Sequence, residues 1–332
     1  MDIQNKEVNK VELNFENSVR PQNFDSFIGQ TNLKESLSLY VKAALKKDAP
    51  LDHVLFYGCP GLGKTTLAKI IANELNSDFK VTSGAVIDKP SDLINTLVSL
   101  KRNDVLFIDE IHRMSKVVEE FLYPALEDNA IDIMIDSTEN KGKNVHRIEL
   151  AKFTVIGATT RAGMISAPLR ERFGIDCRLE YYNEVELAYI AKRTADILGV
   201  KINNTAAEML AKGARGTPRI LNRLVRRCHD YAIIEAKGTI TIKVVQETLK
   251  MLRIYSNGLN SMDKKILETI SDIYDGGPVG INALAASVAE DVETIETVNE
   301  PFLIQNGYIE RTSRGRVITS KAKKFLTGGS NG

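Results

Sequence analysis

Blocks of apolar residues alternate with amphipathic segments from Leu51 to about Glu180. Short, nearly continuous apolar runs are typical of buried strands, and apolar residues at helical spacing indicate helices. The expected elements, in order, are Val54–Tyr57, Thr65–Leu75, Phe79–Thr82, Asp92–Ser99, Val105–Ile108, Val117–Glu127 and Thr154–Ala158. This alternation predicts an α/β fold, with a doubly wound parallel sheet and helices on both faces. A further helix is expected from Thr31, a suitable N-cap, to Lys46.

Residues 130–150 interrupt this alternation. Ile131, Ile133 and Ile135 occupy every second position, a turn-rich polar stretch follows, and alternation resumes at Val145. A period of two on both sides of a turn predicts a β-hairpin inserted before the next core strand. Its isoleucine stripe could be core or an exposed patch for a partner, and the sequence leaves both interpretations open.

The last 150 residues follow two other patterns. Residues 183–255 have a helical apolar period throughout, and Thr217-Pro218 suits the start of one helix. Beyond them we expect helices and then two short strands, the plan of a winged-helix domain: Asp263–Tyr274, Asn282–Ala289, Thr294–Gln305, Tyr308–Thr312 and Arg316–Thr319. The predicted domains are therefore 1–182, 183–255 and 256–332, with residues 1–17 partly disordered.

Composition describes an ordinary globular protein, with 43% hydrophobic and 26% charged residues among 332. The net charge is only +1, so any nucleic-acid contact must come from a local patch. Such a patch is present between residues 306 and 324, where six basic residues face Glu310 alone: Arg311, Arg314, Arg316, Lys321, Lys323 and Lys324. We favour a patch that binds the phosphates of DNA, although a solvated surface or a protein-binding wing would show the same charges.

Other sequence features limit the setting. Cys59, Cys177 and Cys228 are widely spaced, and the four histidines form no ligand motif. Disulfides and a zinc site are therefore not expected, and a reducing cytoplasm fits. The charged N-terminus does not resemble a signal peptide. No apolar run approaches the ~18 residues of a membrane span, so no membrane contact is expected.

The strongest chemical signal is the loop Gly58-Cys59-Pro60-Gly61-Leu62-Gly63-Lys64-Thr65-Thr66, between a strand and a helix. This is the context of a phosphate-binding P-loop. Glycines let backbone N–H groups turn toward phosphate oxygens, and the positive end of the following helix adds to the attraction. Lys64 would reach the β- and γ-phosphates of a nucleotide, and the Thr65 hydroxyl would hold Mg²⁺.

A second motif supports the first. Val105–Ile108 leads into Asp109 and Glu110. In a P-loop enzyme, Asp109 would bind on the Mg²⁺ side and Glu110 would polarise the water that attacks the γ-phosphate. The tetrad Asp109–His112 also resembles a helicase box, but the later helicase motifs are absent from the sequence.

These motifs, in order, resemble those of AAA+ ATPases: Arg20-Pro21, Gly58–Thr66, Asp109–Arg113, Gly157–Arg161, Pro168–Gly174 and Gly216–Arg219. With the winged helix, the chain is similar in detail to the RuvB family of Holliday-junction branch-migration motors. The resemblance runs from about Ser18 to Phe325. One departure is Cys59, where the family usually has proline.

The resemblance implies roles at matching positions. Val19 and Arg20 would line the adenine pocket, and Thr159 or Thr160 would align the attacking water. Tyr182 and Arg219 would contact the nucleotide, and Arg172 would enter the neighbouring subunit's site. Arg311 and Arg316 would contact DNA. The remaining nucleotide-contacting positions are Gly61, Gly63, Lys64, Thr65, Thr66, Glu127, Asp128 and Asn129.

Some of these roles have alternatives. Arg170 could replace Arg172 as the arginine finger, the arginine that enters the neighbouring subunit's site. Either arginine could instead form only a structural salt bridge. Arg219 could be an ordinary surface arginine of a basic helix. Cys59 is small enough for its place in the loop and could make it sensitive to oxidation.

The resemblance further implies an ATP- and Mg²⁺-dependent motor in homologous recombination, DNA repair and the SOS response to DNA damage. Subunits would form a ring, expected to be a hexamer, around double-stranded DNA. The hairpin would dock on a RuvA-like junction-binding protein, and a junction resolvase could join the complex. Two rivals are an AAA+ loader that places a partner on DNA without translocating, and a DNA-binding scaffold with an inactive P-loop.

Overall fold

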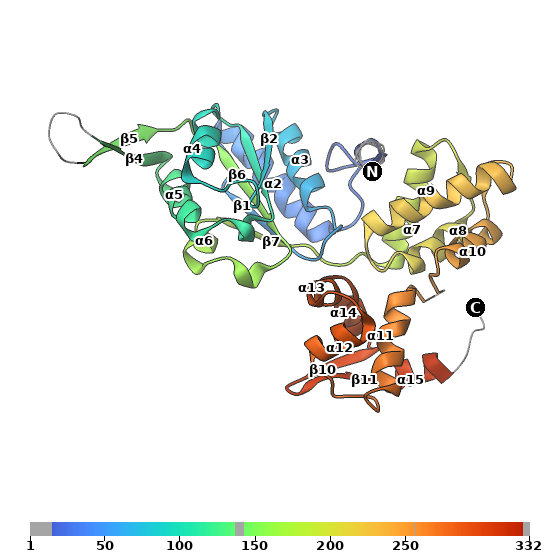
Figure 1. The fold of residues 1–332 in the computed structure, drawn as a ribbon. Helices are drawn as coiled ribbons and strands as arrows, with labels where there is room; N and C mark the ends of the chain where they lie inside the picture. Colours follow the sequence, from blue (N-terminus) through green and yellow to red (C-terminus); the bar gives the residue numbers. More distant parts are fainter. Residues whose placement is uncertain (1–14, 137–142, 256, 328–332) are drawn as a thin grey trace, which may run out of the picture. The chain divides into compact units, whose positions relative to one another are not determined.

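A computed structural model of the chain describes residues 15–136, 143–255 and 257–327 (Figure 1). Two compact units make up the chain. The first ends at Tyr182 and the second begins at Asn183. The predicted disorder of residues 1–17 falls mostly outside the described residues; from Phe15 the chain is already helical.

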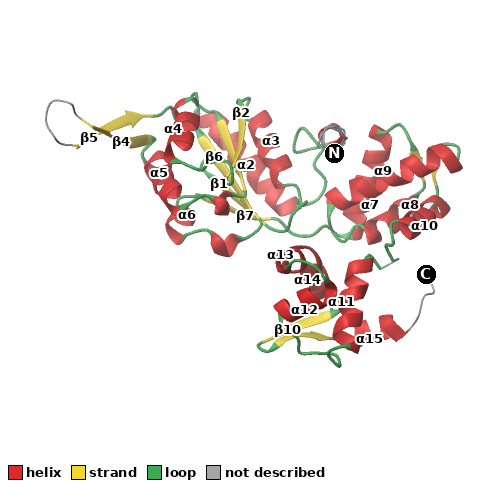
Figure 2. Cartoon of the chain, viewed as in Figure 1, coloured by secondary structure: helices red, strands yellow, loops and turns green. Residues whose placement is uncertain are grey.

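The first unit is built on a five-stranded parallel sheet (Figure 2). Its strands lie in the order β2-β3-β6-β1-β7. Because β6 lies between β1 and β3, the carboxyl ends of these three strands are neighbours. The strands are β1 (Val54–Tyr57), β2 (Phe79–Ser83), β3 (Val105–Asp109), β6 (Thr154–Thr159) and β7 (Ile175–Arg178).

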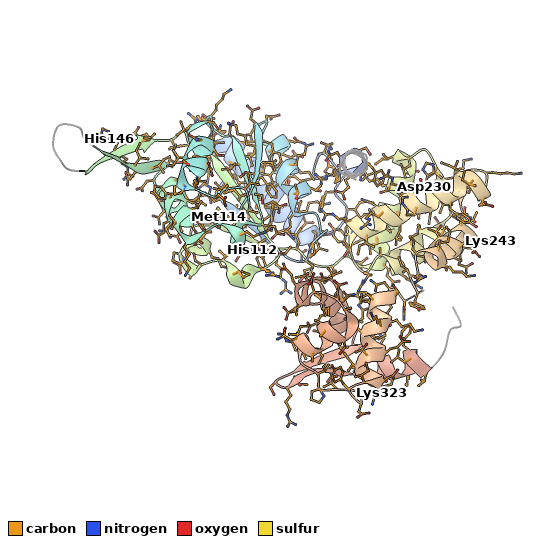
Figure 3. The ribbon with its side chains drawn as sticks, in the orientation of Figure 1. His112, Met114, His146, Asp230, Lys243 and Lys323 are labelled. Carbon is orange, nitrogen blue, oxygen red and sulfur yellow. The ribbon has the colours of Figure 1, made fainter. Side chains whose placement is uncertain are left out.

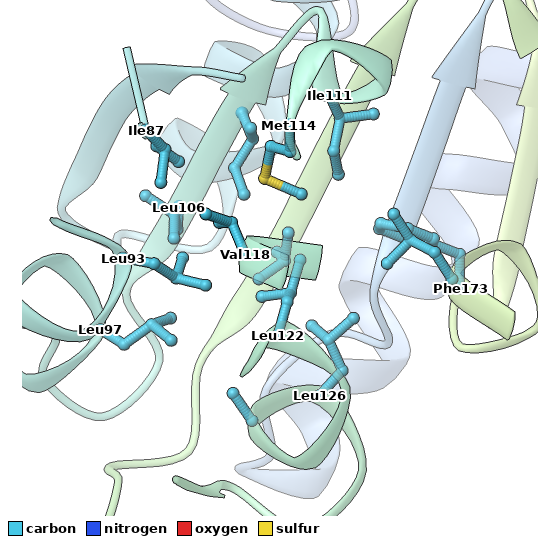
Figure 4. Close-up of a cluster of buried hydrophobic side chains, with 14 of the residues drawn as sticks. Ile87, Leu93, Leu97, Leu106, Ile111, Met114, Val118, Leu122, Leu126 and Phe173 are labelled. Atoms are coloured by element: carbon cyan, nitrogen blue, oxygen red, sulfur yellow. The ribbon is translucent and has the colours of Figure 1, made fainter. Parts of the chain in front are cut away.

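Helices cover both faces of the sheet, as predicted (Figure 1). On one face, Leu93 and Leu97 of α4 and Val118 and Leu122 of α5 pack with Leu106 of β3, all fully buried (Figure 4). Each pair repeats at i, i+4, so one side of each helix faces the core. The helices are α2 (Thr31–Lys47), α3 (Lys64–Glu74), α4 (Pro90–Val98), α5 (Lys116–Glu127) and α6 (Ala167–Glu171).

The inserted hairpin is present. β4 (Ala130–Asp136) pairs antiparallel with β5 (Lys143–Glu149). Ile131 is fully buried and joins the core cluster, whereas Ile133 is half-buried. The side chain of Ile135 lies outside the described residues. Core packing therefore explains the first isoleucine of the stripe, at the base of the hairpin.

The second unit begins with helices. They are α7 (Glu184–Ile197), α8 (Asn204–Gly213), α9 (Pro218–Glu235) and α10 (Ile242–Met251). Two short strands lie in the connections between them and pair in parallel, β8 (Lys201–Ile202) before α8 and β9 (Thr239–Ile240) before α10. Thr217 is the N-cap of α9 and Pro218 its first residue, as predicted. We call residues 183–255 the lid domain.

The rest of the second unit is a winged helix, residues 257–327. Its two strands pair antiparallel, with Arg311 opposite Arg316. The predicted helix Thr294–Gln305 is in fact three consecutive pieces, with a π-helical turn in the middle. The elements are α11 (Ser261–Asp272), α12 (Ile281–Val288), α13 (Val292–Thr294), the π turn Ile295–Asn299, α14 (Glu300–Gln305), β10 (Ile309–Thr312), β11 (Gly315–Ile318) and α15 (Ser320–Thr327).

Candidate nucleotide-binding site

The glycine-rich loop connects β1 to α3 through backbone angles that favour glycine. The φ angles are 143° at Gly58, 80° at Gly61 and 106° at Gly63. A Cβ on Gly58 would lie 2.5 Å from the Leu179 carbonyl oxygen, so a side chain there would clash with backbone. Gly63 is the N-cap of α3 and has no side chain to cap the first turn. Backbone N–H groups in the first turn of a helix are suited to bind an anion.

Lys64 is the first residue of α3, and its side chain is directed back over the loop. Its Nζ donates to the carbonyl oxygens of Gly58 at 2.7 Å and Cys59 at 3.0 Å. The residue is 7% exposed. A buried ammonium group at the uncapped start of a helix fits a ligand carrying several negative charges. Thr65 and Thr66 follow in the same first turn.

The two predicted carboxylates lie at the end of β3. Asp109 is its last residue, and Glu110 follows with φ 45°, in the left-handed region. One Asp109 carboxylate oxygen accepts from the backbone N–H of Glu110 at 3.0 Å. This turn places the Glu110 side chain beside the end of β6.

The two candidate threonines at the end of β6 have different partners. The Thr160 hydroxyl donates to both Glu110 carboxylate oxygens, at 3.0 and 3.3 Å, and its N–H donates at 3.2 Å. The Thr159 hydroxyl lies 2.9 Å from Nδ1 of His112 and accepts from the N–H of Arg161. Thr160 is thus the one that holds Glu110.

His112 is a site residue that the sequence reasoning missed. Its Nδ1 lies 3.2 Å from the Glu110 carboxylate, and its side chain is 7% exposed. Figure 3 labels it on the first unit. The motif Asp109–Arg113 includes His112 and was the available signal, but the resemblance assigned no role to this histidine.

Val19 and Arg20, predicted to line the adenine pocket, and Tyr182, predicted to contact the nucleotide, all belong to the first unit. Val19 is buried, and Arg20 pairs with Glu16 at 3.5 Å. The Tyr182 hydroxyl donates to the carbonyl of Leu62 in the glycine-rich loop, at 3.2 Å. The Phe27 ring packs beside the glycine-rich loop, because a Cβ on Gly63 would lie 3.4 Å from it.

Cys59 has a neighbour of its own. The Tyr181 hydroxyl donates to its Sγ at 2.9 Å, and the residue is half-buried. The loop thus accepts cysteine where the resemblance predicts proline.

Both candidate finger arginines have partners within their own chain. Arg172 lies 4.3 Å above the Tyr123 ring, donates to the Pro168 carbonyl at 2.6 Å and pairs with Glu127 at 3.0 Å. Arg170 instead pairs with Asp176 at 2.6 Å. Both therefore form salt bridges in this state, and a role in trans stays a prediction.

Tyr123 connects Arg172 to a buried carboxylate. Its hydroxyl donates to Glu119 at 2.7 Å. Desolvation, mainly, raises the pKa of the Tyr123 hydroxyl, so the ring stays neutral beneath the guanidinium.

The three residues after α5 that were predicted to lie near nucleotide have separate contacts. Glu127 pairs with Arg172, and Asp128 pairs with Arg147 of β5 at 2.5 Å. Asn129 has φ 51° and accepts from the N–H of Leu150. Asp128 and Asn129 thus tie the base of the hairpin to α5.

The predicted site residues of the second unit are described apart from the loop. Arg219 is the second residue of α9. Arg311 is exposed on β10. Arg316 is 5% exposed and pairs with Glu300 at 2.8 Å and Glu296 at 3.3 Å. The two arginines predicted to contact DNA therefore differ in exposure. Arg311 is open to solvent, whereas the Arg316 guanidinium is paired with carboxylates of its own domain.

Across residues 15–136, 143–255 and 257–327, none of the helices combines the length and the apolar character needed to cross a membrane.

Comparison with protein families gives three consecutive matches. Residues 19–179 match the Holliday junction DNA helicase RuvB P-loop domain, residues 182–255 the RuvB AAA lid domain, and residues 256–327 the RuvB C-terminal winged helix domain. The order is the one that the fold itself shows.

Curated proteins and solved structures are similar over nearly the whole chain. The Holliday junction branch migration complex subunit RuvB of Fusobacterium nucleatum is 52% identical, covering 94% of this chain and 93% of its own. The protein of the same name from Flavobacterium psychrophilum is 51% identical, covering 98% and 95%. The Thermotoga maritima RuvB Holliday junction branch migration motor superposes with a TM-score of 0.84 at 47% identity, covering 95% of this chain and all of that one. Together with the P-loop, lid and winged helix, these likenesses place the chain in the RuvB family.

Proposed function

We propose that this chain is the ATP-hydrolysing motor of Holliday-junction branch migration, acting in recombination and DNA repair. The observation that carries the proposal is that Thr160 donates hydrogen bonds to Glu110 beside a P-loop, in a chain that also has a winged helix. Such a carboxylate suits a general base. The similar proteins, named as a Holliday junction branch migration motor or as a subunit of that complex, supply the substrate class.

The residues around the loop fit a nucleotide with Mg²⁺. Lys64 and the N–H groups of the first turn of α3 hold the phosphates, and Thr65 and Asp109 are the candidate metal ligands. Hydroxyl and carboxylate oxygens are ligands that Mg²⁺ prefers. When bound, the metal neutralises charge that develops on the phosphates.

Glu110 would accept the proton of the attacking water. Its carboxylate needs a fixed direction for this, and Thr160 restrains both oxygens. A general base of this kind contributes about 10²- to 10⁴-fold in rate. In this scheme Thr160 is a positioning residue, and His112 restrains the carboxylate from a second side.

Two arginines complete the proposed site. Arg172 leaves Glu127 and enters the nucleotide site of the next subunit, where it stabilises transition-state charge. Arg219 contacts the phosphates from the lid domain. Loss of the γ-phosphate then changes the contacts of both arginines, and the lid domain rotates. This scheme requires a ring of subunits, proposed to be a hexamer. The proposed location is the cytoplasm.

DNA and protein partners would bind at separate surfaces. Arg311 lies on the exposed wing, where phosphate contact would add salt-dependent affinity. Residues 130–150 form the proposed docking element for a RuvA-like junction-binding protein, and a junction resolvase would join the same complex.

The test is single-molecule tracking of a four-way junction with homologous arms, in ATP and Mg²⁺. Movement of the junction that stops in Glu110→Gln supports the motor. Stable ATP-dependent binding and hydrolysis without movement would instead favour a loader.

A further inference from the structure

The turn between α8 and α9 makes a buried contact with the winged-helix domain. Arg215 lies in this turn with φ 58°. Its Nη2 is 3.2 and 3.1 Å from the two carboxylate oxygens of Asp263 in α11. Its guanidinium carbon lies 4.0 Å from the centre of the Phe302 ring. The Arg215 and Asp263 side chains are 8% and 0% exposed.

Asp263 extends this contact into the winged helix. It accepts from the N–H of Asn260 at 2.8 Å and from Nδ2 of Asn299 at 2.7 Å. Asn299 immediately precedes Glu300, which pairs with Arg316 of the wing strand β11. A line of buried polar contacts therefore leads from the lid domain to the strand opposite Arg311.

A second point of close approach lies at Gly258. Its φ is 82°, and a Cβ there would be 2.8 Å from the carbonyl oxygen of Lys212 and 3.2 Å from the Phe302 ring. Lys212 belongs to α8 and Phe302 to α14. The lid domain and the winged helix thus meet backbone to backbone, with no room for a side chain.

These contacts resist separation of the two domains. Pulling them apart would remove the guanidinium from a fully buried carboxylate, and an unpaired buried charge is strongly unfavourable. The planar guanidinium also fixes direction, because it meets both carboxylate oxygens and an aromatic face together.

We propose that Arg215 and Asp263 form a rigid joint that makes the lid domain and the winged-helix domain turn as one body. This inference rests on the proposed function. Arg219 lies four residues after Arg215, in the first turn of α9. If Arg219 moves when the nucleotide changes, the adjacent turn that carries Arg215 moves with it, and Arg215 holds the winged helix. Arg215 and Asp263 are positioning residues, and they deliver lid rotation to DNA.

The first test separates ATP hydrolysis from DNA movement. The variant is Arg215→Met with Asp263→Asn, since methionine keeps the packing on Phe302 and asparagine can still accept from Asn260. Changing both members together avoids the unpaired buried charge that makes removal of a single partner strongly destabilising. The matched control is Arg227→Met with Asp230→Asn, which removes an exposed pair (49% and 52% exposed) within α9 alone.

The readout is the number of base pairs exchanged per ATP hydrolysed. The joint variant should keep its KM for ATP and lose roughly fivefold or more in this ratio. The control should keep the ratio, and Arg215→Lys, which retains the charge, should lie between. An unchanged ratio in the joint variant, including equal losses of hydrolysis and movement, overturns the joint.

A second measurement needs no change at the joint. Ile234→Cys and Asp272→Cys place dyes on exposed positions of the lid domain and winged helix, in a Cys59→Ala background. The other two thiols are buried, and desolvation raises the pKa of Cys177 to about 12 and of Cys228 to about 11, so they should not be labelled.

Energy transfer between the two dyes should be the same without nucleotide, with ATP and with ADP. A change between these states means that the domains move separately, and the joint is then wrong. If the parent protein fails to move junctions while energy transfer stays constant, the proposed function fails and the rigid joint stands.

Discussion

Thr160 donates hydrogen bonds to both carboxylate oxygens of Glu110, from its hydroxyl at 3.0 and 3.3 Å and from its N–H to one of them. The strand order brings the two residues together, because β6 and β3 are neighbours that end at the same edge of the sheet. The direction of the base is thus set from a different strand.

Thr160→Val should lower kcat for ATP hydrolysis with little change in KM. Valine keeps the shape but removes a hydroxyl bond to a charged group, worth about 1.5–3 kcal/mol, or roughly ten- to a hundredfold in rate. Glu110→Gln should be slower still. Steady-state phosphate release measures both. A Glu110→Gln variant as fast as the parent would remove Glu110 from the mechanism.

Arg172→Ala should still bind ATP but should poison mixed rings. Its side chain would act in the neighbouring site, so one defective subunit affects another subunit's hydrolysis, by about 10³-fold or more per site. ATPase activity is measured while variant and parent are mixed in varying ratio. Arg170→Ala, which breaks the pair with Asp176, is the control. A loss merely proportional to the Arg172→Ala fraction would exclude the role in trans.

Arg311→Ala and Arg316→Ala should have different effects. Arg311 is exposed, so its loss should weaken binding to all DNA sequences and leave stability unchanged. Loss of Arg316 leaves Glu300 buried without its partner, which costs about 3–5 kcal/mol. Salt-dependent DNA affinity and urea unfolding separate the two. Equal stabilities would show that the Arg316–Glu300 pair contributes nothing to the fold.

Stability should fall on mild acidification because of His53. The Val155 N–H donates to its Nδ1 at 2.9 Å, so the hydrogen must be on Nε2, which donates to the Leu126 carbonyl at 3.1 Å. Burial, mainly, lowers the pKa of His53 below 6.5. Below pH 6.5 the unfolded chain binds a proton at His53 that the folded chain does not bind. The free energy of unfolding therefore falls as the pH falls, by at most about 1.4 kcal/mol per pH unit.

Urea unfolding between pH 8 and 5 measures this loss. His53→Gln can keep both hydrogen bonds without titrating, so its stability should depend less on pH over this range. Identical slopes for parent and variant would contradict the assignment.

The sequence predicted the elements with clear patterns. β1 has the predicted bounds, and the predicted limits of β2, β3, β6 and the hairpin differ by little from the observed ones. These segments are buried runs or strict alternations, which depend mainly on local sequence. The P-loop was equally visible, since its glycines are required by φ angles that other residues avoid.

Other features depend on contacts distant in sequence. β7 was missed because its strand is short and mixed, with Asp176 and Arg178 exposed beside Cys177. The sequence predicts Thr31 as the N-cap of α2, but Gln30 is the cap, with φ 51°. The burial of Arg316 could not be read from a basic patch, because Glu300 and Glu296 come from the preceding helical segment.

The proposed motor depends most on a nucleotide site that two subunits share. The direct test is to measure the mass of the protein and its ATPase rate together, across protein concentrations, with Mg²⁺, ATP and duplex DNA present. Hydrolysis per subunit should rise as rings assemble and stay low where the chain is monomeric. A monomer that hydrolyses ATP at the full rate would contradict the account.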